Sequence, residues 1–223
     1  MPANTTAILE DIEQCLGVCF AAQAEATARW HVEEPESPVA GDVATTENLL
    51  ALVLSQHLMN FSLWHVEDTA RRRDVDDSVI ADCKRAIDGF NQRRNDFMEK
   101  IDACLITLLS PVLPVDAADR FNTESLGTAI DRLSILSLKM FHMEEQTLRA
   151  DATPQHIESC RVKLAVLTEQ RSDLARSVLE LVRDYAAGSK RPKVYFQCKM
   201  YNDPALNPEL YGAASAGVGT SKE

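Results

Sequence analysis

Three of the five histidines have a carboxylate three residues further on: His31 with Glu34, His65 with Asp68, and His142 with Glu145. In a helix, residues i and i+3 share a face, so each pair offers an imidazole nitrogen and a carboxylate oxygen side by side. Di-metal helical bundles use such pairs in the order Glu-x-x-His, the reverse of the order found here. The pattern predicts a divalent metal ion bound by His65, Asp68, His142 and Glu145.

The segment from Thr45 or Thr46 to about Arg72 predicts a helix whose apolar stripe is interrupted by polar residues. At about 100° per residue, one line of this helix carries His57, Phe61, Trp64 and Asp68. The line continues the stripe of Leu50 and Val53, so Asp68 is expected to point toward the core. Residues that flank this line are Asn60, Arg71, His65 and, further round, Glu67. An unpaired buried carboxylate costs several kcal/mol, so Asp68 needs a partner.

The next predicted helix begins at an Asp74 or Asp76 cap and runs to about Leu109. Its apolar face is interrupted at mid-length by Asn91 and Arg94 and edged by Lys84, Asn95 and Asp102. Arg94 facing Asp68 is the simplest pairing of the two helices. Such polar groups could either form a site or only fix helix register, because buried ion pairs also serve that purpose.

A fourth helix is predicted from just after Glu124 to about Arg149. One line of it carries Asp131, Ile135, Leu138, His142, Glu145 and Arg149, and most other positions are apolar. A helix that is apolar nearly all round is a buried one, which places Asp131 and His142 in the interior. The alternative is a solvated line with a His142–Glu145 contact, and the sequence leaves both open.

Two further helices complete an all-α fold. One runs from about Thr6 to Glu33, and the other opens at Thr153-Pro154 and stops at Gly188. Five long helices joined by short loops predict antiparallel neighbours in an up-and-down bundle. We expect a single helical domain over residues 1–212, with an extended tail from Lys193 to Tyr211 docked on the bundle. Residues 213–223 are small and polar, which predicts disorder.

Composition excludes several classes of function. The net charge of −11 disfavours binding to nucleic acid or to an anionic membrane surface. The start of the chain has no apolar segment typical of a signal peptide, and no apolar run approaches the roughly 18 residues of a membrane span. The six cysteines form no C-x-x-C pair, which favours free thiols in a reducing cytoplasm.

Two arginines suit recognition of an anionic ligand. Arg71 and Arg94 could bind a phosphate or carboxylate in bidentate fashion. The candidate substrate-binding residues are Asn60, Trp64, Arg71, Asn91, Arg94, Asn95, Lys199, Tyr201 and Asn202. The candidate catalytic residues are His65, Glu67, Asp68, Asp131 and His142. Motifs for other chemistries, such as G-x-S-x-G or a P-loop, do not occur in the sequence.

Several strings resemble the bacterial domain-of-unknown-function family 4254. They are NFSLWHVEDTAR (60–71), KRAID (84–88), NQRRND (91–96), IDRLSIL (130–136), HM (142–143) with Gln146, EQR (169–171) and KMYNDP (199–204). The likeness extends from about Ala44 to Gly212. It implies a cytoplasmic helical protein and supplies no activity, because the family is defined by lacking one.

These observations support two hypotheses. The first is an enzyme or ligand-binding protein with a polar site inside the bundle, metal-dependent and acting on a phosphorylated or other anionic small molecule. The second is a non-catalytic scaffold or partner-binding protein, which could form a homo-oligomer and whose buried polar residues only fix helix register. In that case Tyr195, Phe196, Tyr201 and Tyr211 could form a partner or dimer surface.

Overall fold

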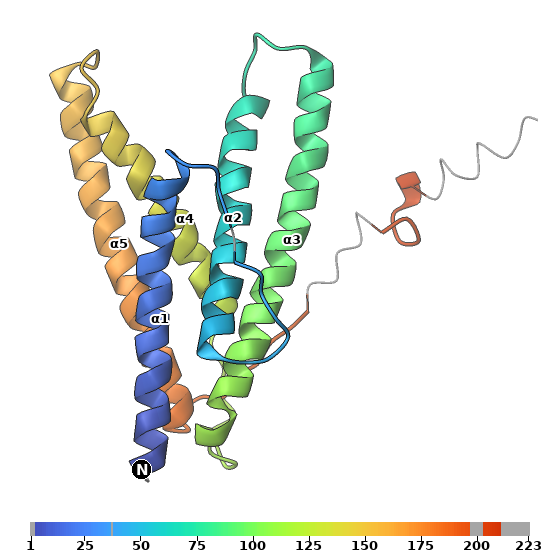
Figure 1. Ribbon diagram of the computed structural model, residues 1–223, viewed down its shortest axis with the longest axis vertical. Coiled ribbons are helices and arrows are strands. Elements are labelled where there is room, and N and C mark those ends of the chain that lie inside the picture. The colour runs from blue at the N-terminus through green and yellow to red at the C-terminus, as the bar shows by residue number, and fades with distance from the viewer. Residues whose placement is uncertain (1–2, 37, 197–202, 211–223) are drawn as a thin grey trace, which may run out of the picture.

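The structure, a computed structural model, describes residues 3–36, 38–196 and 203–210. Five long α-helices and one short 3-10 helix make up most of the described backbone (Figure 1). Their bounds are α1 Ala3–Trp30, α2 Thr46–Ala70, α3 Asp77–Leu109, η1 Ser110–Val112, α4 Leu126–Thr147 and α5 Pro154–Ala186. The described residues contain no β-strand, so the prediction of an all-α bundle is confirmed.

The helices begin where local sequence offers a cap. Thr45, Ser125 and Thr153 each accept a hydrogen bond from the backbone N–H three residues on, which satisfies one of the free donors of the first turn. Asp76 precedes α3 without such a side-chain bond. At the other end of α5, Gly188 takes a φ of 72°, the left-handed conformation that glycine adopts most easily.

The direction of the helices differs from the prediction in one place. The helices α2, α3, α4 and α5 alternate in direction, as short connections require (Figure 1). In contrast, α1 and α2 run the same way, because residues 31–45 travel back along the length of the bundle before α2 begins. This long return contains Pro35 and Pro38, which keep it from continuing α1.

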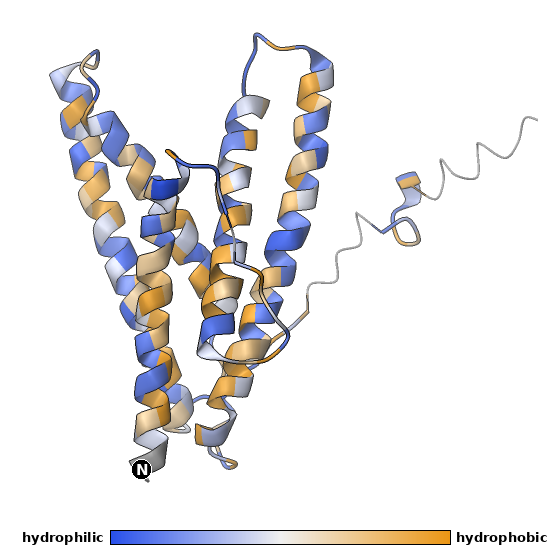
Figure 2. Ribbon diagram, viewed as in Figure 1, coloured by the Kyte–Doolittle hydropathy of each residue, from blue (hydrophilic) through white to orange (hydrophobic). Residues whose placement is uncertain are grey.

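The main core lies at the end of the bundle where α1 begins and the helices converge (Figure 1). Its fully buried residues include Leu16, Leu49, Ile101, Leu105 and Leu133, drawn from four helices. A second, smaller apolar cluster lies further along, made of Ala26, Trp30, Phe61 and Leu138. The inward faces of the helices are correspondingly hydrophobic in Figure 2. Toward the other end, α2–α3 and α4–α5 spread apart as two hairpins.

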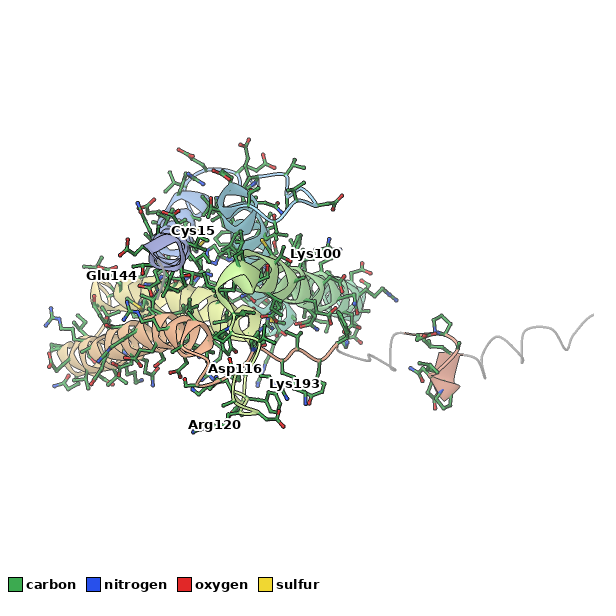
Figure 3. The ribbon with its side chains drawn as sticks, turned by 90° about the horizontal axis from the view of Figure 1, so that it is seen from below. Cys15, Lys100, Asp116, Arg120, Glu144 and Lys193 are labelled. Carbon is green, nitrogen blue, oxygen red and sulfur yellow. The ribbon has the colours of Figure 1, made fainter. Side chains whose placement is uncertain are left out.

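The first residues of the tail pack on the connection between α3 and α4. Arg191 and Lys193 lie over the ring of Phe121, 5.3 Å and 4.2 Å from its centre, as cation–π contacts require. Figure 3 shows Lys193 beside this connection. The tail expected from the sequence therefore contacts the bundle through its cationic residues, whereas Tyr195 and Phe196 are 75% and 76% exposed.

Among the described residues, one helix is long and apolar enough to cross a membrane by length and composition alone. This helix is α2, which the sequence had not predicted to reach that threshold. In the bundle, 56% of its apolar window is buried against other helices. A buried core helix meets the same criterion, so this finding alone does not show that α2 crosses a membrane.

The start of α4 is held against α3 by a close helix–helix approach. Asp102, almost fully buried on α3, accepts a hydrogen bond of 2.7 Å from the backbone N–H of Gly127. A Cβ atom at Gly127 would overlap the carbonyl oxygen of Met98. The glycine is therefore required by the contact that positions α4, the helix that carries Asp131 and His142.

We expect Gly127→Ala to lower the free energy of unfolding by about 1–3 kcal/mol, because the added methyl group must push α3 and α4 apart. Gly17→Ala is the matched control, since a Cβ there meets nothing within 4 Å. That substitution should stabilise α1 by roughly 0.5–1 kcal/mol through helix propensity. Urea denaturation of both variants measures the difference, and equal effects would contradict the close approach.

Candidate metal centre and adjoining polar core

Three histidines from separate parts of the chain meet between α1, α2 and α4. His31 directly follows α1, His65 lies on α2, and His142 lies on α4. One ring nitrogen of each lies within 4.8 Å of the others. His31 and His142 are half-buried, and His65 is the most exposed of the three. Imidazole is the commonest protein ligand of transition metals, so this cluster is a candidate metal centre.

Aromatic rings hold the three imidazoles in place. The ring of His31 stacks on Phe141, with centroids 4.0 Å apart, and the ring of His142 stacks on Trp64 at 4.6 Å. Phe61 meets His65 edge to face at 4.5 Å. Burial lowers the pKa of His65, and the nearby His31 and His142 lower this pKa further. The surroundings of His65 therefore favour its neutral imidazole, the form that binds metals.

Hydrogen bonds at Nδ1 determine which nitrogen of two histidines is free. His31 Nδ1 donates to the carbonyl oxygen of Thr27 at 2.7 Å, and His142 Nδ1 donates to Glu145 Oε2 at 2.8 Å. The Nε2 atoms of His31 and His142 are buried, and neither has a partner among the described residues. With Nδ1 protonated, each Nε2 presents a lone pair. Metal-ligating histidines are typically supported in this way by a carbonyl or a carboxylate.

Two of the expected metal ligands lie elsewhere. Asp68 is not part of the cluster: its side chain is 64% exposed and lies 3.8 Å from Arg71, so the expectation that it points to the core is wrong. At the end of the bundle where α2 ends, the pairs α2–α3 and α4–α5 have spread apart, which leaves room for solvent there (Figure 1). Glu145 supports His142 from outside the cluster. The third histidine of the cluster is His31. The sequence paired His31 with Glu34 but did not predict His31 as a metal ligand.

A buried ion pair connects α3 with α4. Arg94 donates to both oxygens of Asp131, with Nε 2.7 Å from Oδ1 and Nη2 2.5 Å from Oδ2. Asp131 is 2% exposed and also accepts from the amides of Gln56 and Asn60. The predicted pairing of Arg94 with Asp68 is therefore wrong, because a fully buried carboxylate attracts the arginine more strongly than a solvated one does.

A chain of buried hydrogen bonds connects this ion pair with the histidine cluster. Asn60 also donates to Ser134 Oγ at 2.9 Å, and Ser134 contacts Nδ1 of His57 at 2.7 Å. Nε2 of His57 lies 3.0 Å from the hydroxyl of Thr27, which gives its own hydrogen to the Gln23 carbonyl. His57 must therefore donate from Nε2 and accept at Nδ1. The carbonyl of Thr27 completes the connection to His31.

Many of the predicted substrate-binding residues line one cavity of about 460 Å³ between α2, α3 and α4. Those that the structure brings together there are Asn60, Trp64, Arg71, Asn91 and Arg94, and two of the predicted catalytic residues, Glu67 and Asp68, line the same cavity. Asn95 does not line this cavity. Lys199, Tyr201 and Asn202 lie outside the described residues. The cations of the cavity are neutralised, because Arg94 pairs with Asp131 and Arg71 with Glu67 at 3.1 Å.

Sequence reasoning missed the polar residues that α1 contributes. Gln23 and Thr27 are buried on the apolar stripe of α1, and Gln56 and Ser134 are buried on α2 and α4. A polar residue at helical spacing within an apolar stripe is a signal that could have identified Gln23 and Thr27. His57 was recognised on such a stripe, but its partners could not be deduced because they lie on other helices.

We expect Arg94→Met to lower the free energy of unfolding by about 3–5 kcal/mol, because it leaves the Asp131 carboxylate buried without its counter-charge. Arg132→Met is the matched control on the neighbouring position. It removes the ion pair of an exposed arginine with Glu124 and should cost about 0–1 kcal/mol. Chemical denaturation of both variants tests the claim, and a mild effect of Arg94→Met would show that the pair is not buried as described.

The buried His57 predicts a pH dependence of stability. Burial, and then the nearby Arg171, lower the pKa of His57 from 6.5 to about 3. Between these values the unfolded chain binds a proton that the folded chain does not. The contribution of His57 is thus complete above pH 6.5 and falls by about 1.4 kcal/mol per pH unit on acidification.

This contribution is measured as the difference between the wild type and His57→Gln in free energy of unfolding from pH 7 to pH 4. The difference is needed because burial raises the pKa of Asp102, which has the opposite effect on stability. In His57→Gln the free energy of unfolding should fall less steeply on acidification than in the wild type. Substitution of the exposed His156 by Gln serves as the control. Parallel profiles of wild type and His57→Gln would refute the assignment.

Comparison with known proteins places the chain in a family without assigning a function. No curated protein and no solved structure matches it significantly. One family model, described as a protein of unknown function (DUF4254), matches residues 50–194, well over half of the chain. This stretch includes His65, Arg94, Asp131 and His142 and excludes α1 with His31. The chain therefore belongs to the DUF4254 family of proteins of unknown function.

Proposed function

We propose that the protein is a metal-dependent enzyme whose centre is held by His31, His65 and His142. The observation that carries this proposal is the state of two ring nitrogens. Nε2 of His31 and Nε2 of His142 are buried and without a partner among the described residues, and both histidines belong to the cluster with His65. Buried polar atoms in folded proteins are nearly always satisfied, so two such acceptors call for a hydrogen-bond donor or a metal ion.

The donor set suits a first-row transition metal of the zinc class. Three neutral imidazoles with the fourth position open is the ligand set of several catalytic zinc sites. At a zinc–nitrogen distance of about 2.0–2.1 Å, three tetrahedral ligands lie about 3.4 Å apart. The ring nitrogens of the cluster lie up to 4.8 Å apart, so the imidazole rings must rotate slightly inward to bind one metal ion. His65 has the most freedom to rotate, because its ring is the most exposed.

Such a metal ion would supply a hydroxide at neutral pH by lowering the pKa of a bound water, which supports hydrolytic chemistry. The residues of this chain would do the remaining work. Glu145 and the Thr27 carbonyl orient two of the ligands. Trp64 and Asp68 line the cavities on both sides of α2, and Asp68, being solvated, is the candidate proton acceptor. Glu67 lines one of these cavities and is the second candidate.

The substrate is proposed to be a small anionic molecule in a cytoplasmic setting. Arg71 and Arg94 are weaker candidates for its recognition than the sequence implied, since both are engaged by carboxylates. The free thiols of the five described cysteines favour a reducing compartment.

A second candidate function, a non-catalytic scaffold, is favoured by the Asp131 network. Asp131 receives hydrogen bonds from α2 and α3 and is itself part of α4, an arrangement that would fix the register of three helices. Asp131 is therefore reassigned from a catalytic to a positioning role. The scaffold hypothesis accounts for this ion pair and leaves the two unpartnered histidine nitrogens unexplained.

Metal analysis of protein purified without chelator tests the proposal. We expect about one equivalent of zinc or another first-row metal per chain. His65→Gln and His142→Gln should each reduce the metal content at least tenfold, since a three-ligand site loses most of its affinity with one ligand. His156→Gln removes an exposed histidine on α5 and should retain the metal.

Cobalt(II) added to the metal-free protein gives a second measurement that does not depend on activity. Coordination by histidines should produce visible absorption bands with one-to-one stoichiometry, and these should vanish in His142→Gln. Circular dichroism of each variant separates loss of the site from loss of the fold. A folded wild type that takes up neither zinc nor cobalt would exclude the metal centre and leave the scaffold hypothesis.

A further inference from the structure

A groove of about 720 Å³ lies beside the histidine cluster, between α2, α4 and α5. Its apolar surface comes from Trp64, Met143, Val162, Val166 and Leu167. Val162 and Val166 are 58% and 48% exposed, an unusual position for two valines on one helix face. Cavities of about 300–1,000 Å³ are the size that holds a small organic ligand.

The cationic side chains that line this groove have no ion-pair partner among the described residues, unlike those of the cavity between α2, α3 and α4. Lys139 and Lys163 line the groove, and neither has an ion-pair or hydrogen-bond partner among the described residues. The one carboxylate of the groove, Asp68, lies on the α2 side and is shared with Arg71. The α4–α5 side is therefore an apolar surface with unneutralised positive charge.

The two lysines lie toward opposite ends of the groove. A hydrogen bond of 3.0 Å from Arg171 Nε to Ser137 Oγ fixes the register of the antiparallel helices α4 and α5. In this register Lys139 lies near Gln170, and Lys163 lies near Gln146. Seven residues separate Lys139 from Gln146, which at 1.5 Å per residue is about 10 Å along the helix axis. An apolar strip about this long thus runs between two cationic ends.

We propose that this groove binds an elongated apolar molecule that carries a carboxylate or phosphate group. The apolar body would cover Val162, Val166 and Met143, and the anionic group would pair with Lys139 or Lys163. Charge complementarity favours this occupant over an uncharged one, and a groove volume within the range of small-ligand sites favours a free small molecule over a membrane surface.

The groove adjoins the candidate metal centre through His142. Its ring lines the groove, stacks on Trp64, and belongs to the three-histidine cluster. A ligand in the groove therefore lies next to a proposed metal ligand. The assignment of this ligand as the substrate rests on the function proposed above, whereas binding of the ligand does not.

Binding of decanoate, decanedioate and decanol to the protein as purified tests the proposal. Calorimetry gives the affinities, and Trp64 at the groove provides a fluorescence signal. We expect decanoate to bind about fivefold or more tightly than decanol, because only the acid meets a lysine. If both lysines contribute, decanedioate binds more tightly than decanoate. Equal affinities for decanoate and decanol would overturn the proposed charge recognition.

Matched variants assign the site. Lys139→Gln and Lys163→Gln should each weaken decanedioate binding about fivefold. Lys100→Gln is the control, since Lys100 lies on α3 away from α5 (Figure 3) and should change nothing. Val166→Glu places a carboxylate in the groove and should weaken binding at least about tenfold. Val18→Glu, at an equally exposed valine of α1, should not.

Other occupants are distinguished in the same preparations. Light scattering that detects a dimer dissociated by Val166→Glu would make the groove an interface between two copies and overturn the proposal. Sedimentation with anionic vesicles, abolished in Lys163→Gln, would indicate a lipid surface and overturn it too. A protein that binds decanoate but no metal would support the proposed ligand of the groove and refute the metal function. A protein that binds metal but not decanoate would support the metal function and refute the proposed ligand.

Discussion

A carboxylate with almost no exposed surface, Asp131, is the constraint on which the arrangement of the other helices depends. Its charge is tolerable in the interior only because Arg94 and the amides of Gln56 and Asn60 all donate to it. These donors come from two helices, so α2 and α3 must lie at a particular height and rotation relative to α4. Shifting any of them by one turn would leave a buried charge without its partners. The ion pair thereby determines the register of the bundle.

The same register determines where the histidines meet. From Asp131 the hydrogen bonds continue through Asn60 and Ser134 to His57, and from His57 to Thr27 on α1. The carbonyl of Thr27 holds His31. The bonds from Asn60 to Thr27 are buried and the bond to His31 is partly buried, so the position of His31 depends on a network that begins at the ion pair. The network is structural, and the exposed side of the histidine cluster is where ligand chemistry would occur.

Much of the fold was predictable from the sequence because it depends on local interactions. Caps at Thr45, Ser125 and Thr153 and the glycine stop at Gly188 are properties of a few adjacent residues. The burial of Asp131 was one of two arrangements that the local pattern allowed, since α4 is apolar on most of its circumference, and the structure decides for burial. The parallel course of α1 and α2 was not predictable, because a connection of this length permits either direction. The proposed pairing of Arg94 with Asp68 was wrong for a related reason: two helices alone do not reveal the competing carboxylate on a third.

By itself, the sequence determined the helices, their boundaries and the faces that carry polar residues, because periodicity and capping act within one segment. It also indicated that histidines with nearby carboxylates could bind a metal. Only the tertiary structure decided that His31 joins His65 and His142, that Glu145 orients a ligand, and that Asp68 stays in solvent. Partners on different helices depend on helix packing, which no single segment encodes. Likewise, only the tertiary structure shows that Lys139 and Lys163 have no ion-pair partner within the part of the chain that is described.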